Sequence, residues 1–338
     1  MTASRIPGLD ALRGLAALLV LGYHARTVAP LAAIWPPVAL GHGYLAVDLF
    51  FVISGFVLAR AYDERLTAGE GGAFMVRRLK RLYPMALLGL LLGAAICLGQ
   101  GKDPVSVMLL LALGLVFAPF TGGRDVFPLN GPQWSLMWEL LANLAYALVA
   151  PWLTTRRLIG LVLVAGVAHA GLVLSHGTGS LGPYAQDGWA GAPRVVFGFF
   201  AGVLLARQRF KVPDAPIAVL LALVVLTLSP PVPEFARGVF DLVAALAVFP
   251  LVVASAAGAE VGVLRPLLDR LAGLSYALYA LHIPIVLGLA HWGLGALAIP
   301  AALVAAWAAH RWFEPWAASL LARKPQGFST SLPSSSTR

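Results

Sequence analysis

The sequence is poor in charged residues and contains a single cysteine. Charged side chains make up 12% of its 338 residues and hydrophobic ones 59%, whereas a soluble domain carries roughly 25% charged residues. This balance excludes an ordinary soluble domain and indicates an integral membrane protein. Cys97 has no partner for an intrachain disulfide. The sequence also lacks a Cys/His metal-ligand spacing, a glycine-rich phosphate loop and a Gly-x-Ser-x-Gly elbow, which argues against metal sites and serine-hydrolase chemistry.

Apolar segments recur along the whole chain at lengths that can cross a hydrocarbon core of about 30 Å. We expect an all-α fold, a polytopic transmembrane helical bundle of about ten spans. Segment 104–121 is the expected exception, as a re-entrant or half-crossing element, and an eleventh full span is the alternative. The candidate spans are 9–28, 41–60, 84–100, 104–121, 134–153, 157–176, 190–207, 215–230, 238–258, 273–292 and 295–318.

Basic residues gather in the short connections between these segments. The positive-inside rule therefore accounts for the net charge of +9 without a nucleic-acid partner. Placing every strongly basic connection in the cytoplasm also places both termini there. We treat residues 1–324 as one integral membrane domain, and we expect the Ser/Thr-rich residues 325–338 to form a disordered cytoplasmic tail.

Ionisable residues interrupt the first apolar segment. Arg13 and His24 are eleven positions apart. In a helix their side chains therefore point within about 20° of one another around the axis and lie about 16 Å apart along it. A charged side chain at the centre of a bilayer helix costs roughly 2.5 to 3.5 kcal/mol, so it persists where it faces a cavity, a partner or a substrate. A snorkelling arginine or an interfacial histidine is the alternative for either residue alone. Their alignment favours a functional face.

Two later segments carry polar residues at the helical spacing of three or four, so each set shares one face. Such stripes often do no more than hydrogen-bond one helix to another, but Glu139 and His282 are harder to explain in this way. The members of the two stripes are Ser135, Glu139, Asn143 and Tyr146, and then Ser275, Tyr279 and His282.

Asp48 lies at intervals of seven from Gly41 and Gly55. Small residues on one helix face let another helix approach closely, and Asp48 is available to pair with an intramembrane Arg or His. The stretch 60–81 is expected to be a basic loop that ends with Arg78-Leu-Lys-Arg81. A solvated anchoring loop is one interpretation. The other is a site for a phosphorylated ligand, because guanidinium groups grip phosphate oxygens in pairs.

Taken together, these residues resemble the acyltransferase-3 family of integral membrane acyltransferases, which includes bacterial O-acetyltransferases of glycans. The resemblance covers residues 1 to about 318, and five motifs occur in the family's order. One departure is Asn143-Leu-Ala-Tyr146, where many relatives carry a bulkier aromatic before the Tyr. The motifs are Leu9-Asp-Ala-Leu-Arg13 with His24, Val47-Asp-Leu-Phe-Phe-Val-Ile-Ser-Gly-Phe56, Arg78-Leu-Lys-Arg81 with Pro84, Trp134-Ser-Leu with Glu139, and Ser275-Tyr with Tyr279 and His282.

The resemblance implies that residues 1–324 form an acyltransferase domain in a bacterial inner membrane. The expected reaction moves an acyl group, commonly acetyl, from acyl-CoA to a hydroxyl of a carbohydrate, a lipid-linked glycan or another cell-envelope acceptor. Acyl-CoA is a co-substrate, and we expect no permanently bound cofactor or metal. The rival interpretation is a proton-coupled secondary transporter, but no convincing internal repeat supports it.

The residues suggest roles in this reaction. His24 is the candidate base, because a neutral imidazole takes a proton near neutral pH, and a covalent acyl-imidazole at His24 is the alternative. Arg13 is expected to bind the donor's phosphates or to stabilise developing negative charge, and Glu139 either orients His24 or contacts the acceptor. The remaining expected substrate-binding residues are Asp48, Arg78, Arg81, Trp134, Ser135, Ser275, Tyr279 and His282.

Overall fold

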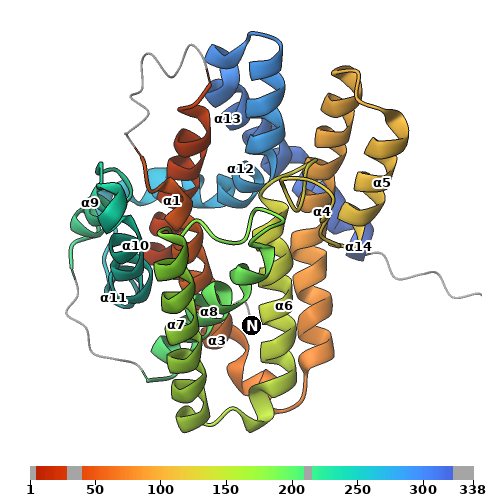
Figure 1. The fold of residues 1–338 in the computed structure, drawn as a ribbon. Helices are drawn as coiled ribbons and strands as arrows, with labels where there is room; N and C mark the ends of the chain where they lie inside the picture. Colours follow the sequence, from red (N-terminus) through yellow and green to blue (C-terminus); the bar gives the residue numbers. More distant parts are fainter. Residues whose placement is uncertain (1–4, 29–39, 209–214, 323–338) are drawn as a thin grey trace, which may run out of the picture.

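The computed structural model describes residues 5–28, 40–208 and 215–322, and this part of the chain is a bundle of helices (Figure 1). The predicted tail, 325–338, lies outside the described residues. The helices are α1 (Pro7–Ala25), α3 (Ala46–Thr67), α4 (Gly71–Gly99), α5 (Pro104–Leu115), α6 (Gln133–Val149), α7 (Thr155–His176), α8 (Gly191–Gln208), α9 (Ile217–Leu228), α10 (Glu234–Val243), α11 (Phe249–Ala256), α12 (Arg265–His291), α13 (Ala298–Ala308) and α14 (Glu314–Ala322). Short π-helical turns join α10 to α11 and α13 to α14.

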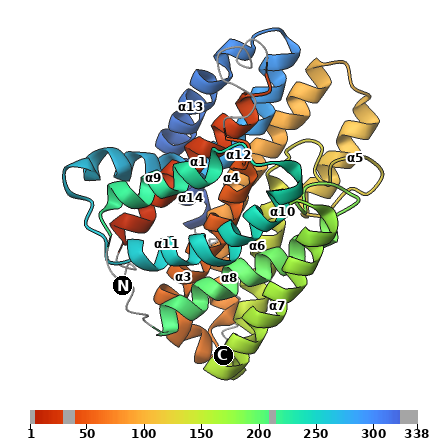
Figure 2. The same cartoon turned by 60° about the vertical axis from the view of Figure 1, so that its left-hand side comes forward.

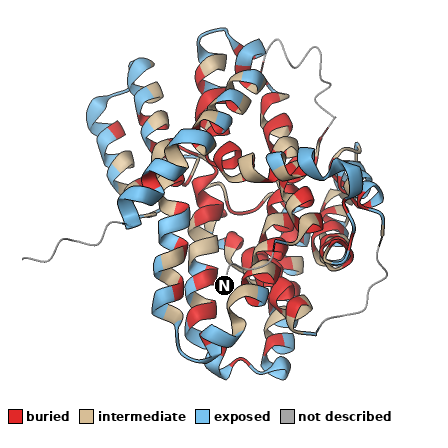
Figure 3. Cartoon of the chain, turned by 180° about the vertical axis from the view of Figure 1, so that it is seen from behind, coloured by how far each residue is buried: buried red, intermediate tan, exposed pale blue. Residues whose placement is uncertain are grey.

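The outer surface of the bundle is apolar, as a membrane protein requires. Large hydrophobic side chains such as Val105, Val167 and Leu226 are mostly exposed, and the outward sides of the helices are coloured as exposed in Figure 3. Water would penalise so much uncovered apolar surface, whereas lipid does not. Among the residues that the structure describes, seven helical segments are long and apolar enough to span a membrane. They are Gly43–Thr67, Gly71–Gly99, Thr155–His176, Gly188–Gln208, Glu234–Ala256, Gly262–His291 and Gly295–Ala322.

Two of the apolar segments are too short to cross the membrane fully. Helices α5 and α9 each have 12 residues, which is about 18 Å of helix and too short for a core of about 30 Å. For 104–121 this length agrees with the expected half-crossing element. For 215–230, predicted as a full span, it is a correction. The predicted total of about ten crossings counted 215–230 and is not confirmed.

The predicted loop 60–81 is helical instead. Helix α3 continues to Thr67 and α4 begins at Gly71, so only a turn at Ala68–Glu70 separates them, with Gly69 in the left-handed region at φ 88°. This helical hairpin ends at the same side of the bundle as the α6–α7 turn and the end of α8 (Figure 1). Arg65, Arg157 and Arg207 therefore gather at one face, which is the distribution that the positive-inside rule expects of a cytoplasmic face.

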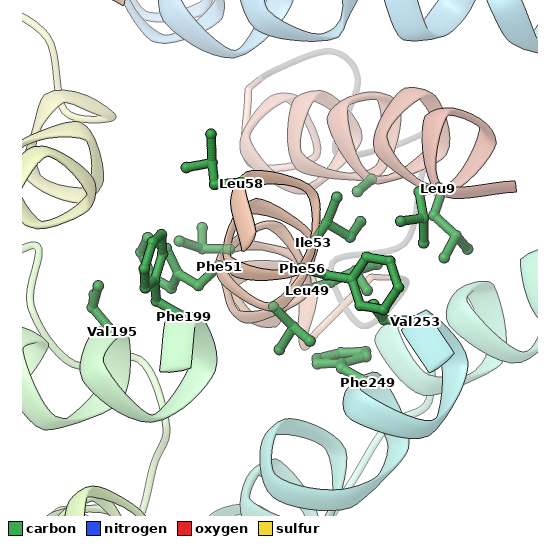
Figure 4. Close-up of a cluster of buried hydrophobic side chains, with 14 of the residues drawn as sticks. Leu9, Leu49, Phe51, Ile53, Phe56, Leu58, Val195, Phe199, Phe249 and Val253 are labelled. Carbon is green, nitrogen blue, oxygen red and sulfur yellow. The ribbon is translucent and has the colours of Figure 1, made fainter. Parts of the chain in front are cut away.

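Helix α3 forms the centre of the main hydrophobic core, where it packs against α8, α1 and α11 (Figure 4). The close approach to α8 depends on glycine, because a Cβ on Gly55 would lie 1.8 Å from the carbonyl oxygen of Phe199. A Cβ on Gly202 of α8 would similarly lie 2.1 Å from the Val52 oxygen. The expectation that Gly55 admits a neighbouring helix is confirmed.

Helix α12 lies between α1 and α4 (Figures 1 and 2), and a proline shapes it at the level of the polar stripe. Pro284 has no N–H to bond the carbonyl four residues earlier, which is that of Ala280. The Asn130 side chain donates to that oxygen at 3.0 Å, so the carbonyl keeps a hydrogen-bond partner. Gly89 of α4 leaves room for this contact, since a Cβ there would lie 2.4 Å from the Ala280 oxygen.

Candidate active site

Two polar faces meet between α1 and α12. Arg13 donates to the Ser275 hydroxyl at 3.4 Å, and the rings of His24 and His282 lie 5.1 Å apart between centroids. The two helices therefore run in the same direction, with an arginine–serine contact at one level and a pair of imidazoles further along. The helical spacing of both stripes predicted that each set shares a face, and the structure adds that the faces oppose one another.

The two histidines have different surroundings. His282 is 1% exposed, and its Nδ1 donates to the carbonyl oxygens of Leu278 and Tyr279 at 3.1 and 2.8 Å. His24 is half-buried and its ring contacts the edge of Tyr23 at 4.8 Å. Neither ring nitrogen of His24 has a hydrogen-bond partner within the described ranges. His24 is thus the more accessible of the two imidazoles.

A tyrosine and a serine border the histidine pair. The hydroxyl of Tyr279 lies 2.5 Å from that of Ser135, and Ser135 donates to the carbonyl of Pro132 at 2.9 Å. Tyr279 therefore acts as the donor to Ser135, because a hydroxyl has only one proton to give. The Tyr279 ring also contacts Phe50 and His282, which links α3, α6 and α12 around the imidazoles.

A second cluster contains three cations, Arg13, Arg78 and Arg81, which we call the arginine cluster. Arg13 interacts electrostatically with both other arginines and with Glu139. Arg78 donates to Glu139 at 2.6 Å, and the Ser54 hydroxyl donates to the same carboxylate oxygen at 2.8 Å. The cluster and Glu139 join α1, α4 and α6. A positively charged site for an anionic ligand can therefore form from residues that are far apart in sequence.

One expectation about this cluster needs correction. Arg78 was placed in an exposed loop, but it is buried within α4, where an ion pair with Glu139 offsets the cost of burying its charge. Of the two arginines in the Arg78-Leu-Lys-Arg81 motif, Arg81 is exposed. Glu139 was a candidate to orient His24, yet its contacts in the described chain are with Arg78 and Ser54. Its expected role, to orient His24 or to contact the acceptor, stays a prediction.

Asp48 and Trp134 belong to a third group, built around an arginine that the sequence reasoning missed. Arg194 of α8 donates to both oxygens of Asp48, at 2.8 and 2.7 Å, and to the carbonyls of Leu181 and Tyr44. Its guanidinium also lies 5.4 Å from the Trp134 ring. The available signal was the position of Arg194 inside the apolar span 190–207, away from its ends. The Asp48 carboxylate is occupied by this contact.

The arrangement places a group of guanidinium side chains and an imidazole at two levels along α1. Guanidinium groups suit phosphate oxygens, and a half-buried imidazole suits proton transfer. Among the residues that the structure describes, no three His, Cys, Asp or Glu side chains group as metal ligands would. The apolar surface, the long helices and the buried polar faces define an integral, multi-pass membrane protein with an intramembrane polar site.

Comparison with known proteins gives the family. Residues 6–316 match the acyltransferase domain family, and the chain belongs to it. A Rhizobium radiobacter protein described as "Protein 2 in picA locus" is 39% identical over 163 residues, which is 41% of this chain and 79% of that protein. No solved structure matches the chain.

Two further relatives carry functional names. A putative O-acetyltransferase of Staphylococcus aureus (strain COL) is 40% identical over 107 residues, 30% of this chain. A putative peptidoglycan O-acetyltransferase, YrhL of Bacillus subtilis (strain 168), is 39% identical over 87 residues, 25% of this chain. The matches span 16% and 12% of these two relatives, so they describe a short region of much longer proteins.

Proposed function

We propose that this protein is a membrane O-acyltransferase that moves an acyl group, in its simplest form acetyl, from acyl-CoA to a hydroxyl of a cell-envelope carbohydrate. Membership of the acyltransferase family supports the reaction class. The observation that carries the proposal is that α1 carries His24 at one level and, at another, Arg13, which joins Arg78 and Arg81 of α4 in the arginine cluster. The names of the relatives from Staphylococcus aureus and Bacillus subtilis support acetyl as the transferred group and a glycan as the acceptor.

The arginine cluster is the proposed binding site for the donor's phosphates. Arg81 is exposed and makes the first contact, whereas Arg13 and the buried Arg78 supply positive charge deeper in the bundle. The eleven-residue separation of Arg13 and His24 within α1 corresponds to about 16 Å. A CoA ester is suited to such a gap, because its long pantetheine arm separates the phosphates from the thioester.

His24 is the proposed base. As the acceptor's hydroxyl oxygen bonds to the thioester carbonyl carbon, its proton passes to a ring nitrogen of His24. The C–S bond then breaks with the electron pair going to sulfur, and His24 returns the proton to the thiolate, which leaves as free CoA thiol. The absence of a hydrogen-bond partner for either ring nitrogen within the described residues supports His24 as the group left available to substrate.

The direct test combines an in vitro assay with a chemical comparison of cells. Purified protein in proteoliposomes should release CoA thiol from acetyl-CoA only when a hydroxyl acceptor is present. Mass spectrometry of glycans and lipids from cells with and without the protein should then find ester-linked acetyl groups that depend on it. Substrate uptake into the proteoliposomes without any thiol release would instead support a transporter.

A further inference from the structure

The unused ring nitrogen of His282 suggests how His24 is held in its reactive form. Nδ1 of His282 faces two carbonyl oxygens of its own helix, those of Leu278 and Tyr279. Carbonyl oxygens only accept hydrogen bonds, so Nδ1 must carry the proton. The other nitrogen, Nε2, is then left with a lone pair and no proton. It is buried and without a partner within the described chain.

The neutral state of this imidazole also follows from its surroundings. His282 is 1% exposed, and within the described chain it contacts no carboxylate, since its ring neighbours are His24 and Tyr279. A buried charge without a partner is costly. His282 therefore remains a neutral ring with one fixed donor and one fixed acceptor.

The acceptor edge of His282 is turned away from α12. Because Nδ1 bonds back to the backbone of α12, the distal Nε2 projects toward the neighbouring helices, and α1 brings the His24 ring into contact at 5.1 Å. The two rings are in contact rather than hydrogen-bonded. Hydrogen bonds of catalytic bases are commonly long without substrate and tighten when it binds.

We propose that His282 is a positioning residue whose Nε2 accepts a hydrogen bond from the ring N–H of His24. This bond fixes the tautomer of His24, so that its opposite nitrogen presents a lone pair to the acceptor hydroxyl. When His24 takes the hydroxyl proton, the same bond stabilises the resulting imidazolium. The role is the one that a carboxylate plays behind a catalytic histidine, carried out here by a neutral imidazole in an apolar setting. The inference rests on the proposed function of His24.

The test uses two amide side chains, each of which takes the position of a different nitrogen of the His282 ring. In His282→Gln the amide oxygen reaches the position of Nε2, whereas in His282→Asn the amide reaches only that of Nδ1. His282→Gln should therefore keep kcat within about threefold of the parent, and His282→Asn should lower kcat at least about tenfold, the scale of a lost hydrogen bond to a charged group. KM for acyl-CoA should change little in either variant, because the arginine cluster is untouched.

Equal loss of kcat in both variants, or full activity in His282→Asn, would overturn the proposal. A second measurement does not depend on catalysis. In protein labelled with nitrogen-15 histidine and reconstituted in bilayers, NMR should find His282 protonated at Nδ1. The His24 signals should shift in His282→Asn and stay near their parent positions in His282→Gln. His282 protonated at Nε2 would contradict the inference even if no acyl transfer were detected, whereas a protein that transfers no acyl group with these NMR signals intact would refute only the proposed function.

Discussion

The Asp48–Arg194 pair tests whether Asp48, a residue of the Val47–Phe56 motif, binds substrate or stabilises the fold. The side chains of Arg194 and Asp48 are 1% and 5% exposed, and the guanidinium bonds both carboxylate oxygens. Removing one partner leaves the other charge buried and unpaired, which costs about 3 to 5 kcal/mol. Asp48→Asn and Arg194→Met should each lower the free energy of unfolding by this amount.

The double variant separates pairing from other effects. The second substitution removes the charge that the first left unpaired, so the double variant should lose about as much stability as one single variant, rather than the sum of both. Unfolding in mixed micelles with increasing denaturing detergent measures these differences. Acyl transfer per folded molecule should stay close to the parent value. An Asp48→Asn protein of parental stability with no activity would refute this reasoning and return Asp48 to substrate binding.

Three further predictions concern the donor site, the core and the orientation. Arg81→Lys should weaken acyl-CoA affinity at least several-fold, because an ammonium cannot reproduce a bidentate guanidinium contact, whereas the control Arg65→Lys should bind normally in the same calorimetric titration. Gly55→Ala should lower unfolding stability by about 3 kcal/mol or more, because its Cβ would lie 1.8 Å from a backbone oxygen. The matched Gly160→Ala, with no atom within 4 Å of its Cβ, should leave stability unchanged or slightly higher. In a Cys97→Ser background, Gly72→Cys should react with an impermeant thiol reagent only from the cytoplasm and Lys102→Cys only from outside, and the reverse pattern would contradict the predicted orientation.

The sequence predicted the polar faces well because helical periodicity is a local property. The spacing of Arg13 and His24, and that of Ser275 and His282, fixes which side chains share a face before any packing is known. The position of Arg78 could not be predicted in the same way. A run of basic residues is typical of a loop, and only the tertiary contact with Glu139 of another helix explains its burial.

The sequence also could not predict which residues the polar side chains contact. Asp48 and Arg194 are 146 positions apart, and no periodicity joins residues across such a separation. The same holds for Asn130, which bonds the carbonyl left free before Pro284. The length of α9 was misjudged for another reason. Mean hydropathy over 215–230 does not register that the helix begins after Pro216 and ends before Ser229-Pro230, which leaves 12 residues.

The central claim is that His24 transfers the proton in an acyl transfer reaction, and its most direct test is the rate of His24→Gln in proteoliposomes. Glutamine keeps polarity and hydrogen bonding but cannot accept a proton near neutral pH. With acetyl-CoA and a hydroxyl acceptor supplied, the account predicts a rate lowered by roughly a hundredfold or more, with acyl-CoA affinity and unfolding stability unchanged. A His24→Gln protein that transfers acyl groups at near the parent rate would contradict the account.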